Sequence, residues 1–233
     1  MTGKLLVLTG ASSGIGLATA ERFCERHYRV INISRRPCPL DGVQTLSCDL
    51  SVPHFENELA SKLASAIGED GEICLVHNAA TYRRDKSGWL TNDELRRVLE
   101  VNLLAPNALP NLVVPRMRAG SSVLYVGSTL SEQAVANTCS YTTSKHALAG
   151  MMKALCQDLS GSGVHTAMIC PGFTDTEMLR AHTPAVAMPT IKSMTAFGRL
   201  IEPSEIAAAL HWAACSPVIN GSVVHANLGQ LTA

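Results

Sequence analysis

The chain has 233 residues, and its composition and charge exclude several classes of protein. Lysine and arginine together number 19, as do aspartate and glutamate, so we expect no strongly basic surface and no nucleic-acid partner. With 46% hydrophobic and 16% charged residues the chain is too apolar for intrinsic disorder, yet no apolar run is long enough to predict a membrane span.

The eight cysteines form no CxxC pair and no cluster with histidine, so no metal site is predicted. An even number of cysteines leaves disulfides possible, but several lie in apolar runs that are typical of buried, reduced thiols. No charged and apolar leader precedes the first strand pattern. We therefore expect a cytoplasmic protein with reduced cysteines.

Short apolar runs typical of buried strands alternate along the chain with helical patterns. Strands are predicted at residues 4–9, 29–34, 43–48, 73–77, 122–127, 164–170 and 222–226. Helices are predicted at residues 15–27, 56–67, 92–118, 141–160 and 203–215. Because strands separated by helices need crossover connections, we predict an α/β fold with a doubly wound parallel sheet of about seven strands and helices on both faces. No linker divides the chain, so we expect a single domain over residues 1–233.

A glycine-rich loop, Thr9-Gly10-Ala11-Ser12-Ser13-Gly14-Ile15-Gly16, separates the first predicted strand from the first predicted helix. Glycines let the backbone turn sharply and approach a pyrophosphate, and the following helix presents free N–H groups and a partial positive charge. The pattern predicts a dinucleotide site with contacts from Gly10, Ser12, Ser13, Gly14, Ile15 and Gly16. A glycine-rich turn without a ligand is the alternative.

The residues after the second predicted strand indicate which dinucleotide binds. An acidic residue there would accept from a ribose 2′-hydroxyl, but this chain has Ser34, Arg35 and Arg36. A guanidinium binds a 2′-phosphate through charge-assisted hydrogen bonds, so we predict NADP(H), with two solvated arginines as the alternative. Asp49 follows the third predicted strand, where its carboxylate can accept from an adenine amino group, and Leu50 beside it is assigned to the same site.

Four further residues indicate acid–base chemistry. Tyr141 and Lys145 are four apart at the start of a predicted helix and share one face of it. Ser128 follows the fifth predicted strand, where parallel sheets present ligand-binding residues, and Asn102 lies in the long helical pattern. Pro106 in that pattern has no N–H to donate to the Asn102 carbonyl, so we expect the helix to bend there.

These motifs occur in an order that resembles the short-chain dehydrogenase/reductase family over almost the whole chain. The resemblance rests on the glycine loop, Asp49, His77-Asn78-Ala79-Ala80, Asn102, Ser128, Tyr141-x-x-x-Lys145 and Pro171-Gly172. It implies a Rossmann-type fold, hydride transfer between a nicotinamide and a carbonyl/alcohol pair, and a catalytic tetrad of Asn102, Ser128, Tyr141 and Lys145. It also implies a homodimer or homotetramer formed through the two long helices.

The resemblance assigns further residues to the cofactor: Asn78, Ala79, Ala80, Tyr141, Lys145, Pro171, Gly172, Thr174 and Thr176. The substrate is expected to contact Ser128, Tyr141 and Phe173, with the loops 81–89 and 129–138 beside it. Residues 174–200 show no periodicity, and a segment of that kind in a compact domain is often a substrate lid. His77, at the end of an apolar strand, is expected to be a packed, hydrogen-bonded core residue rather than a ligand.

The residue types suit carbonyl reduction. A hydride that reaches a carbonyl carbon leaves charge on the oxygen, so Tyr141 is predicted as the general acid/base and Ser128 as the group that holds the oxygen. Lys145, together with the oxidised nicotinamide, is expected to lower the pKa of Tyr141. We predict an NADP(H)-dependent oxidoreductase that reduces a small-molecule ketone or aldehyde. The alternatives are a 3-oxoacyl-carrier-protein reductase and a catalytically silent NADP-binding sensor or scaffold.

Overall fold

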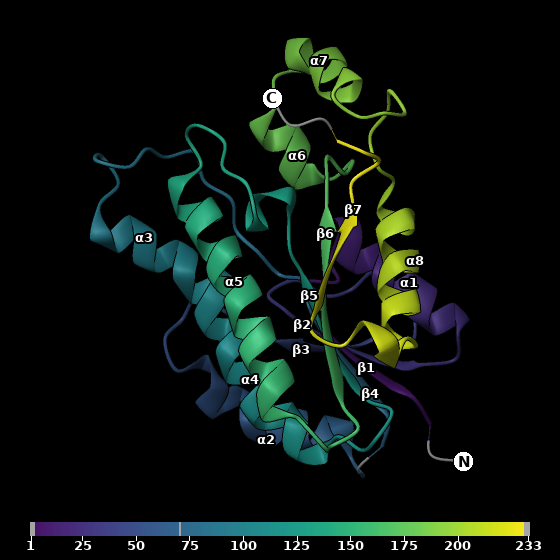
Figure 1. The fold of residues 1–233 in the computed structure, drawn as a ribbon. Coiled ribbons are helices and arrows are strands. Elements are labelled where there is room, and N and C mark those ends of the chain that lie inside the picture. The colour runs from purple at the N-terminus through teal and green to yellow at the C-terminus, as the bar shows by residue number, and fades with distance from the viewer. Residues whose placement is uncertain (1–2, 70, 231–233) are drawn as a thin grey trace.

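The computed structural model describes residues 3–69 and 71–230 of the chain. Within them, one sheet of seven parallel strands runs in the order β3-β2-β1-β4-β5-β6-β7 (Figure 1). The strands are β1 (Leu5–Thr9), β2 (Arg29–Ser34), β3 (Gln44–Ser47), β4 (Ile73–His77), β5 (Ser122–Val126), β6 (His165–Pro171) and β7 (Ser222–Ala226). The predicted parallel sheet is confirmed, and each predicted strand end lies within one residue of the observed end.

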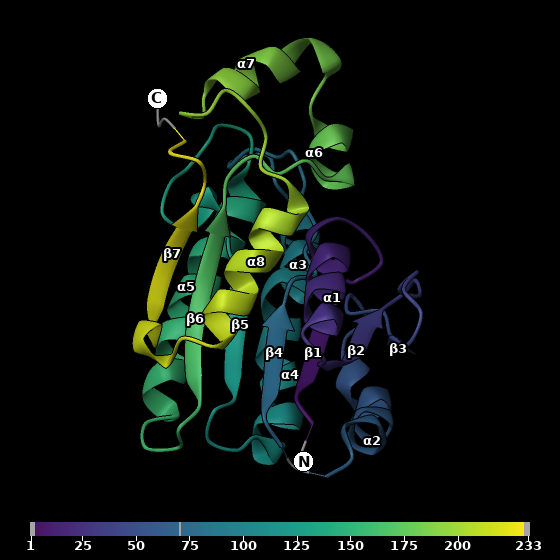
Figure 2. The same ribbon diagram turned by 90° about the vertical axis from the view of Figure 1, so that its right-hand side faces the viewer.

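Helices cover both faces of the sheet, as predicted (Figure 2). The helices are α1 (Gly14–Glu25), α2 (Phe55–Ile67), α3 (Asn92–Leu99), α4 (Ala105–Val113), α5 (Cys139–Asp158), α6 (Glu177–His182), α7 (Met188–Ser193) and α8 (Pro203–Ala214). Helices α2, α4 and α5 pack on one face, and α1 and α8 pack together on the other. Helices α6 and α7 lie beyond the carboxyl ends of β6 and β7 (Figure 2).

The strand sequences explain why both faces must be covered. Successive side chains of a strand point to opposite faces, so Leu5 and Val7 pack towards α2 and α4, whereas Leu6 and Leu8 pack towards α1 and α8. None of these four side chains is more than 5% exposed. Each large apolar side chain contributes about 1.5–3 kcal/mol when it is fully buried, so a strand that is apolar on both faces is stable only between two helical layers.

The order of the strands reverses at β1. This strand pairs in parallel register with β2 on one side and β4 on the other, so that Val7 lies between Ile31 and Leu75. Ligands of open α/β sheets bind in the crevice at the carboxyl ends of the strands where the order reverses. The fold therefore places the turns after β1 and β4, which hold the glycine loop and Asn78, at the edge of that crevice.

The helix predicted at residues 92–118 is interrupted, so this prediction is wrong as a single helix. A π-helical turn, Glu100–Leu104, separates α3 from α4, and a 3₁₀ turn, Val114–Arg116, follows α4. The Ala105 N–H donates to the Glu100 carbonyl, five residues earlier. Pro106 comes next and has no N–H to continue an α-helical register, so the expected distortion beside Pro106 is confirmed as a widened turn.

The prediction that segment 174–200 is irregular is wrong. The segment contains α6, α7 and a 3₁₀ turn, Ala185–Ala187. Helices α6 and α7 have six residues each, fewer than two turns, which is too short for a periodic pattern to appear.

The described residues form a single domain, and residues 1–2, 70 and 231–233 of the predicted domain lie outside them. In the described part of the chain, none of the helices combines the length and the apolar character needed to cross a bilayer. The cytoplasmic location stays a prediction.

Candidate active site

The glycine loop after β1 adopts a backbone that requires glycine. Gly10 has a φ of +77° and Gly14 a φ of +55°, both in the left-handed region. A Cβ on Gly16 would lie 2.1 Å from the Gly10 carbonyl oxygen, so the loop folds directly onto the first turn of α1, which also contains Ile15. Among the described residues, the hydroxyl of the N-cap residue Ser13 makes no capping hydrogen bond. The Ser13 hydroxyl and the first N–H groups of α1 therefore fit a dinucleotide pyrophosphate.

Asn78, directly after β4, holds the glycine loop after β1 in place through side-chain and backbone hydrogen bonds. Its Nδ2 donates to the Thr9 carbonyl at 2.9 Å and to the Gly10 carbonyl at 3.2 Å. The N–H groups of Asn78 and Ala79 both donate to Thr9 Oγ1, at 3.0 and 2.9 Å. Asn78, Ala79 and the partly exposed Ala80 therefore border the predicted cofactor crevice, and the Asn78 side chain supports the loop that would hold the pyrophosphate.

Arg36 extends across the glycine loop. Its Nη2 lies 3.3 Å from Ser12 Oγ and 3.5 Å from Ser13 Oγ. On the opposite side, Nη2 lies 3.7 Å from Glu177 Oε2 of α6. The Ser34 hydroxyl donates to the Arg36 carbonyl and so closes the turn after β2. Of the two predicted arginines, Arg36 is the one whose guanidinium lies beside the loop hydroxyls.

Asp49 and Leu50 lie at the end of β3. Asp49 Oδ1 accepts from the Ser51 N–H at 3.0 Å and from the Ser51 hydroxyl at 2.7 Å. These hydrogen bonds, with a smaller contribution from the charge of Arg35, hold the pKa of the Asp49 carboxyl below its usual range. The carboxylate is therefore ionised and able to accept, as predicted for an adenine contact, while Leu50 is buried in the core beside it.

Ser128, Tyr141 and Lys145 come together beyond the end of β5. Lys145 Nζ lies 5.5 Å from the centre of the Tyr141 ring and donates to the Val126 carbonyl at 2.8 Å. The Ser128 side chain is close enough to the Tyr141 phenol to lower the pKa of that phenol. Ser128 Oγ also accepts from the Leu130 N–H at 3.1 Å, which leaves the Ser128 proton available for donation. Three predicted side chains from two separate segments therefore share one site.

Burial sets the protonation states of this cluster. Desolvation raises the pKa of Tyr141 to about 12, and the nearby Ser128 side chain opposes this rise. Desolvation lowers the pKa of Lys145 to about 8. Desolvation is the largest influence on both groups in the protein without its cofactor, so the expectation that Lys145 and the oxidised nicotinamide together lower the Tyr141 pKa stays a prediction. At neutral pH, Tyr141 therefore keeps its proton and Lys145 is largely charged.

Asn102 lies in the π-helical turn and connects two parts of the site. Its Oδ1 accepts from the Thr81 N–H at 2.8 Å, and its Nδ2 donates to the Thr81 carbonyl at 2.9 Å and to Ser144 Oγ at 3.0 Å. The Ser144 hydroxyl in turn donates to the Tyr141 carbonyl at 2.7 Å. These hydrogen bonds join the Asn102 side chain, which is 1% exposed, to the Tyr141 backbone through Ser144.

The turn after β6 brings the start of segment 174–200 to the glycine loop. Thr176 is the N-cap of α6, and its Cγ2 lies 3.2 Å from the position that a Cβ on Gly14 would take. The buried Thr174 donates through its hydroxyl to the Gly172 carbonyl at 3.1 Å. The predicted residues of this turn lie between the end of β6 and the start of α6: Pro171, Gly172, Phe173, Thr174 and Thr176.

Three residues of the site were missed by sequence reasoning. Asn32, buried in β2, accepts from the Ala11 N–H at 2.9 Å and so holds the glycine loop; a polar residue inside an apolar strand is the signal that could have found it. Asp85 accepts hydrogen bonds at the start of α5. His182 of α6 lies with its ring centre 4.7 Å from that of Tyr82. Neither Asp85 nor His182 has a local sequence signal.

His77 is packed in the core as predicted, at 3% exposure, and its ring stacks on Tyr125 at 4.7 Å. The predicted hydrogen bonding is wrong, because neither ring nitrogen of His77 nor the Tyr125 hydroxyl has a partner among the described residues. Burial lowers the pKa of His77 to about 3. His77 is therefore a neutral core residue at physiological pH.

Comparison with known proteins agrees with the assembled site. The family model described as short chain dehydrogenase matches residues 4–187. Carbonyl reductase family member 4 of Danio rerio is 27% identical over 232 residues, with 95% of each chain covered. A 3-oxoacyl-(acyl-carrier-protein) reductase of Vibrio cholerae is 28% identical over 242 residues, with 99% of this chain and 98% of that protein covered.

The fold is also shared with solved structures. The crystal structure of a short chain dehydrogenase family protein from Francisella tularensis superimposes with a TM-score of 0.88 at 22% identity, covering 98% of each chain. The family match spans most of the chain and includes the glycine loop, Ser128, Tyr141 and Lys145. The chain therefore belongs to the short-chain dehydrogenase family, whose members are oxidoreductases that bind NAD(H) or NADP(H).

Proposed function

We propose that this protein is an NADP(H)-dependent reductase of a ketone or aldehyde, with Tyr141 as the general acid. The observation that supports it is the meeting of the Ser128 hydroxyl, the Tyr141 phenol and the Lys145 ammonium at the carboxyl end of the sheet, where the glycine loop also lies. Relatives that match over nearly their whole length are named as carbonyl and 3-oxoacyl reductases, which supports a carbonyl substrate.

The side chains divide the proton chemistry among them. When bound, the nicotinamide cofactor supplies the hydride to the carbonyl carbon. Tyr141, which keeps its proton at neutral pH, donates that proton to the oxygen on which charge develops. Ser128 donates a hydrogen bond to the same oxygen and stabilises its charge. Lys145 stabilises the phenolate that remains, because its ammonium is close to the ring and both are shielded from water.

The pKa of Lys145 predicts how reduction depends on pH. Its pKa is about 8, so the ammonium is present below that pH and is lost above it. The rate constant kcat for carbonyl reduction should therefore be level between pH 6 and 7 and fall above about pH 8, because a neutral amine cannot stabilise the Tyr141 phenolate. Steady-state rates at saturating NADPH and substrate check this. A kcat that rises steadily through pH 9 would contradict the role of Lys145.

The decisive variant for the function is Tyr141→Phe. It removes one oxygen and keeps the ring that packs in the site, so NADPH should bind with an unchanged Kd while turnover is lost. The assay is NADPH consumption against a panel of ketones, aldehydes and 3-oxoacyl thioesters, with NADPH fluorescence as the binding measurement. A protein that binds NADPH but reduces no member of the panel, with or without Tyr141, would support a catalytically silent sensor instead.

Cofactor selection is proposed to depend on Arg36 more than on Arg35, because the Arg36 guanidinium lies at Ser12 and Ser13. A charge-assisted hydrogen bond contributes about 1.5–3 kcal/mol, so Arg36→Leu should weaken NADPH binding about 10- to 150-fold. The Kd of NADH should barely change, because NADH has no 2′-phosphate. Arg35→Leu is the matched control and should have a smaller effect. Equal Kd values for NADPH and NADH in the unaltered protein would contradict NADP(H) selection.

A 3-oxoacyl-(acyl-carrier-protein) substrate is the second candidate, favoured by the relative from Vibrio cholerae. The same panel separates the two candidates. A kcat/KM at least tenfold higher for a carrier-linked 3-oxoacyl group than for simple ketones would identify the carrier-linked substrate.

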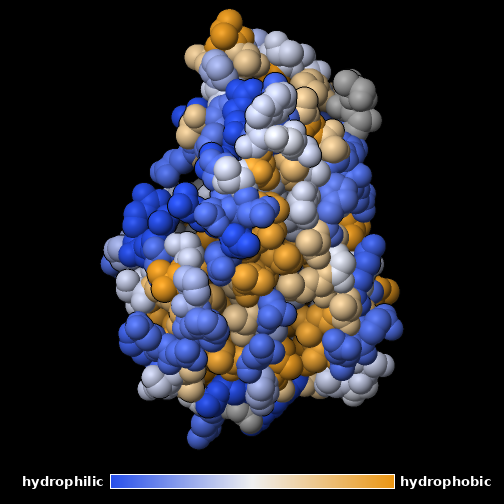
Figure 3. Space-filling model, turned by 90° about the vertical axis from the view of Figure 1, so that its left-hand side faces the viewer, coloured by the Kyte–Doolittle hydropathy of each residue, from blue (hydrophilic) through white to orange (hydrophobic). Residues whose placement is uncertain are grey.

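We also propose that the protein is a homodimer or homotetramer in which α4 and α5 face a second copy. Figure 3 shows an apolar area in the middle of the face on the α4 and α5 side of the molecule, framed by polar residues. Leu104, at the end of the π-helical turn before α4, is 47% exposed. A large apolar area on a protein surface favours burial against a partner. Light scattering measures the mass in solution, and a monomer would contradict this proposal.

A further inference from the structure

Residues 81–85, here called the strap, belong to the loop between β4 and α3 and are held at both ends by other segments of the chain. At one end, the N–H and the carbonyl of Thr81 bond to the Asn102 side chain at 2.8 and 2.9 Å. At the other end, the Asp85 N–H donates to the Asn137 carbonyl at 3.0 Å, and the Asp85 carboxylate accepts from Ser140. The strap is therefore tied to the π-helical turn and to the helix that bears Tyr141.

The contact of Asp85 with α5 replaces a cap that this helix lacks. The N-cap residue of α5, Thr138, makes no side-chain capping bond within the described residues, and the first turn of α5 has no acidic residue. Asp85 Oδ1 accepts from the Ser140 N–H at 2.9 Å, and its other oxygen accepts from the Ser140 hydroxyl. An ionised carboxylate at a helix N-terminus satisfies a free N–H and interacts favourably with the helix dipole. Ser140 is the residue directly before Tyr141.

Between these two ends, Tyr82 contacts the ring of Tyr141. The ring centres are 5.0 Å apart at an interplanar angle of 64°, an edge-to-face arrangement that aromatic pairs favour. On the other side, the Tyr82 ring contacts His182 of α6, with centres 4.7 Å apart. The strap thus touches both the backbone before Tyr141 and the Tyr141 ring, and it connects them to segment 174–200.

We propose that the strap positions the Tyr141 phenol for proton donation: Asp85 holds the first turn of α5, and Tyr82 restricts rotation of the Tyr141 ring. Asp85 and Tyr82 are positioning residues, because they act on the substrate through Tyr141. This inference rests on the proposed role of Tyr141 as the general acid. A proton donor displaced by about 1 Å can lose up to about 100-fold in rate, so the strap should affect kcat much more than cofactor binding.

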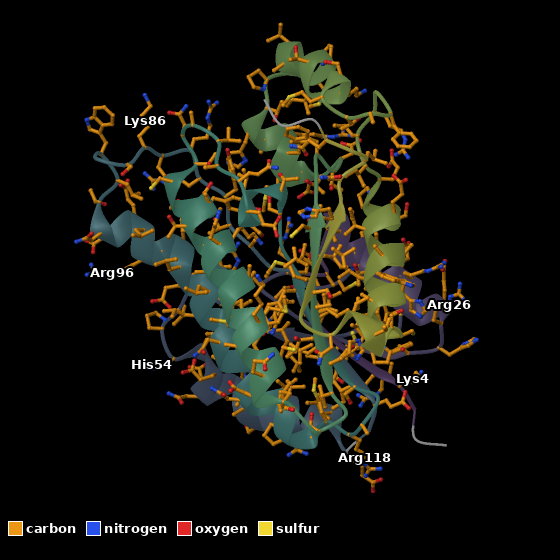
Figure 4. The ribbon with its side chains drawn as sticks, in the orientation of Figure 1. Lys4, Arg26, His54, Lys86, Arg96 and Arg118 are labelled. Carbon is orange, nitrogen blue, oxygen red and sulfur yellow. The ribbon has the colours of Figure 1, made fainter. Side chains whose placement is uncertain are left out.

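The first test compares Asp85→Ala with Asp85→Asn and with Arg26→Ala. Asp85→Ala removes the cap and should lower kcat about tenfold, with the KM and the Kd of NADPH changed less than twofold. Asp85→Asn keeps an oxygen that accepts from the Ser140 N–H, so it should recover most of the lost rate. Arg26 follows α1, and its exposed side chain extends away from the fold, so Arg26→Ala should match the unaltered protein (Figure 4). An unchanged kcat in Asp85→Ala would overturn the proposal.

Milder substitutions at two other residues keep the test valid if Asp85→Ala fails to fold. Ser140→Ala removes only the hydroxyl bond to Asp85 and should lower kcat by a smaller factor. Tyr82→Leu removes the aromatic contact and should lower kcat about tenfold, whereas Tyr82→Phe keeps the ring and should be nearly fully active. Equal activity of Tyr82→Leu and Tyr82→Phe would contradict the role of the Tyr82 ring.

A spectroscopic measurement tests the strap even if the protein reduces no carbonyl compound. The chain has four tyrosines, so labelling with 3-fluorotyrosine should give four ¹⁹F resonances, of which Tyr141 and Tyr28 are assigned from their phenylalanine variants. In Asp85→Ala the Tyr141 resonance should shift and broaden, while that of Tyr28 stays unchanged. An unmoved Tyr141 resonance would overturn the strap, whereas an inactive unaltered protein would overturn only the proposed function.

Discussion

Replacement of Gly16 by alanine tests whether close contact of the glycine loop with α1 forms the cofactor site. A Cβ at this position would lie 2.1 Å from the Gly10 carbonyl oxygen and 2.6 Å from Asn78 Nδ2. Favourable contacts between non-bonded heavy atoms need about 3.5–4.0 Å, so the loop must move away from α1 by more than about 1 Å. Two of the three atoms that the Cβ would meet belong to the backbone of Gly10, which cannot rotate away as a flexible side chain could.

The magnitude follows from the cost of overpacking. Forcing a methyl group into a well-packed site costs about 1–3 kcal/mol, and at about 1.4 kcal/mol per factor of ten this weakens NADPH binding about 5- to 150-fold if the loop retreats from the pyrophosphate. The loop is also attached to β1 and to Asn78, so the free energy of unfolding should fall as well. Fluorescence titration with NADPH and urea unfolding measure the two effects separately.

Gly150→Ala is the matched control. Gly150 lies within α5, and no heavy atom of the same chain is within 4 Å of the position that its Cβ would take. Alanine is favoured over glycine inside a helix by about 1 kcal/mol, so this variant should unfold at a higher urea concentration and bind NADPH as before. If Gly16→Ala binds NADPH and unfolds like the unaltered protein, the reasoning that places the pyrophosphate against this loop is refuted.

Two further variants test the polar core around the site. Asn32→Ala leaves the buried Ala11 N–H without its acceptor, which should cost about 1–3 kcal/mol in urea unfolding and weaken NADPH binding; an unchanged midpoint would contradict the role of Asn32. His77→Leu should make the free energy of unfolding depend less on pH in the acid range. The folded-state pKa of His77 is about 3 against 6.5 when unfolded, so between these values the unfolded chain binds the proton and stability falls as pH falls. By pH 5 this amounts to about 2 kcal/mol, and unfolding curves at pH 8 and pH 5 should lie closer together in His77→Leu.

Local patterns in the sequence were sufficient for the sheet and for the main parts of the site. The apolar runs of β1 and β4 predict buried strands because each is apolar on both faces, and parallel strands present their carboxyl ends at one edge. The sequence alone therefore places the glycine loop and Ser128 at that edge. The spacing of Tyr141 and Lys145 places both on one helix face, which is a property of helix geometry alone.

The tertiary structure decided which side chains meet across segments. The sequence offered both Arg35 and Arg36 as candidates for binding the 2′-phosphate, and the direction of the turn after β2 determined that the Arg36 guanidinium lies beside the hydroxyls of Ser12 and Ser13. Desolvation is the largest influence on the Tyr141 pKa in the protein without its cofactor, and the burial that causes it depends on packing from several elements.

The contacts made by the strap around Tyr141 also depend on the tertiary structure and could not be predicted from the sequence. Asp85 reaches the start of α5 across 55 positions of the chain, and His182 reaches Tyr82 from a helix too short to appear in the hydrophobic pattern. Helix and strand periodicity determine which face of an element a residue occupies. The angle and height at which two elements pack decide which residues on those faces touch, and these depend on all the side chains between them. The sequence alone therefore determined the fold and the reactive groups, and the packing determined how those groups are held and protonated.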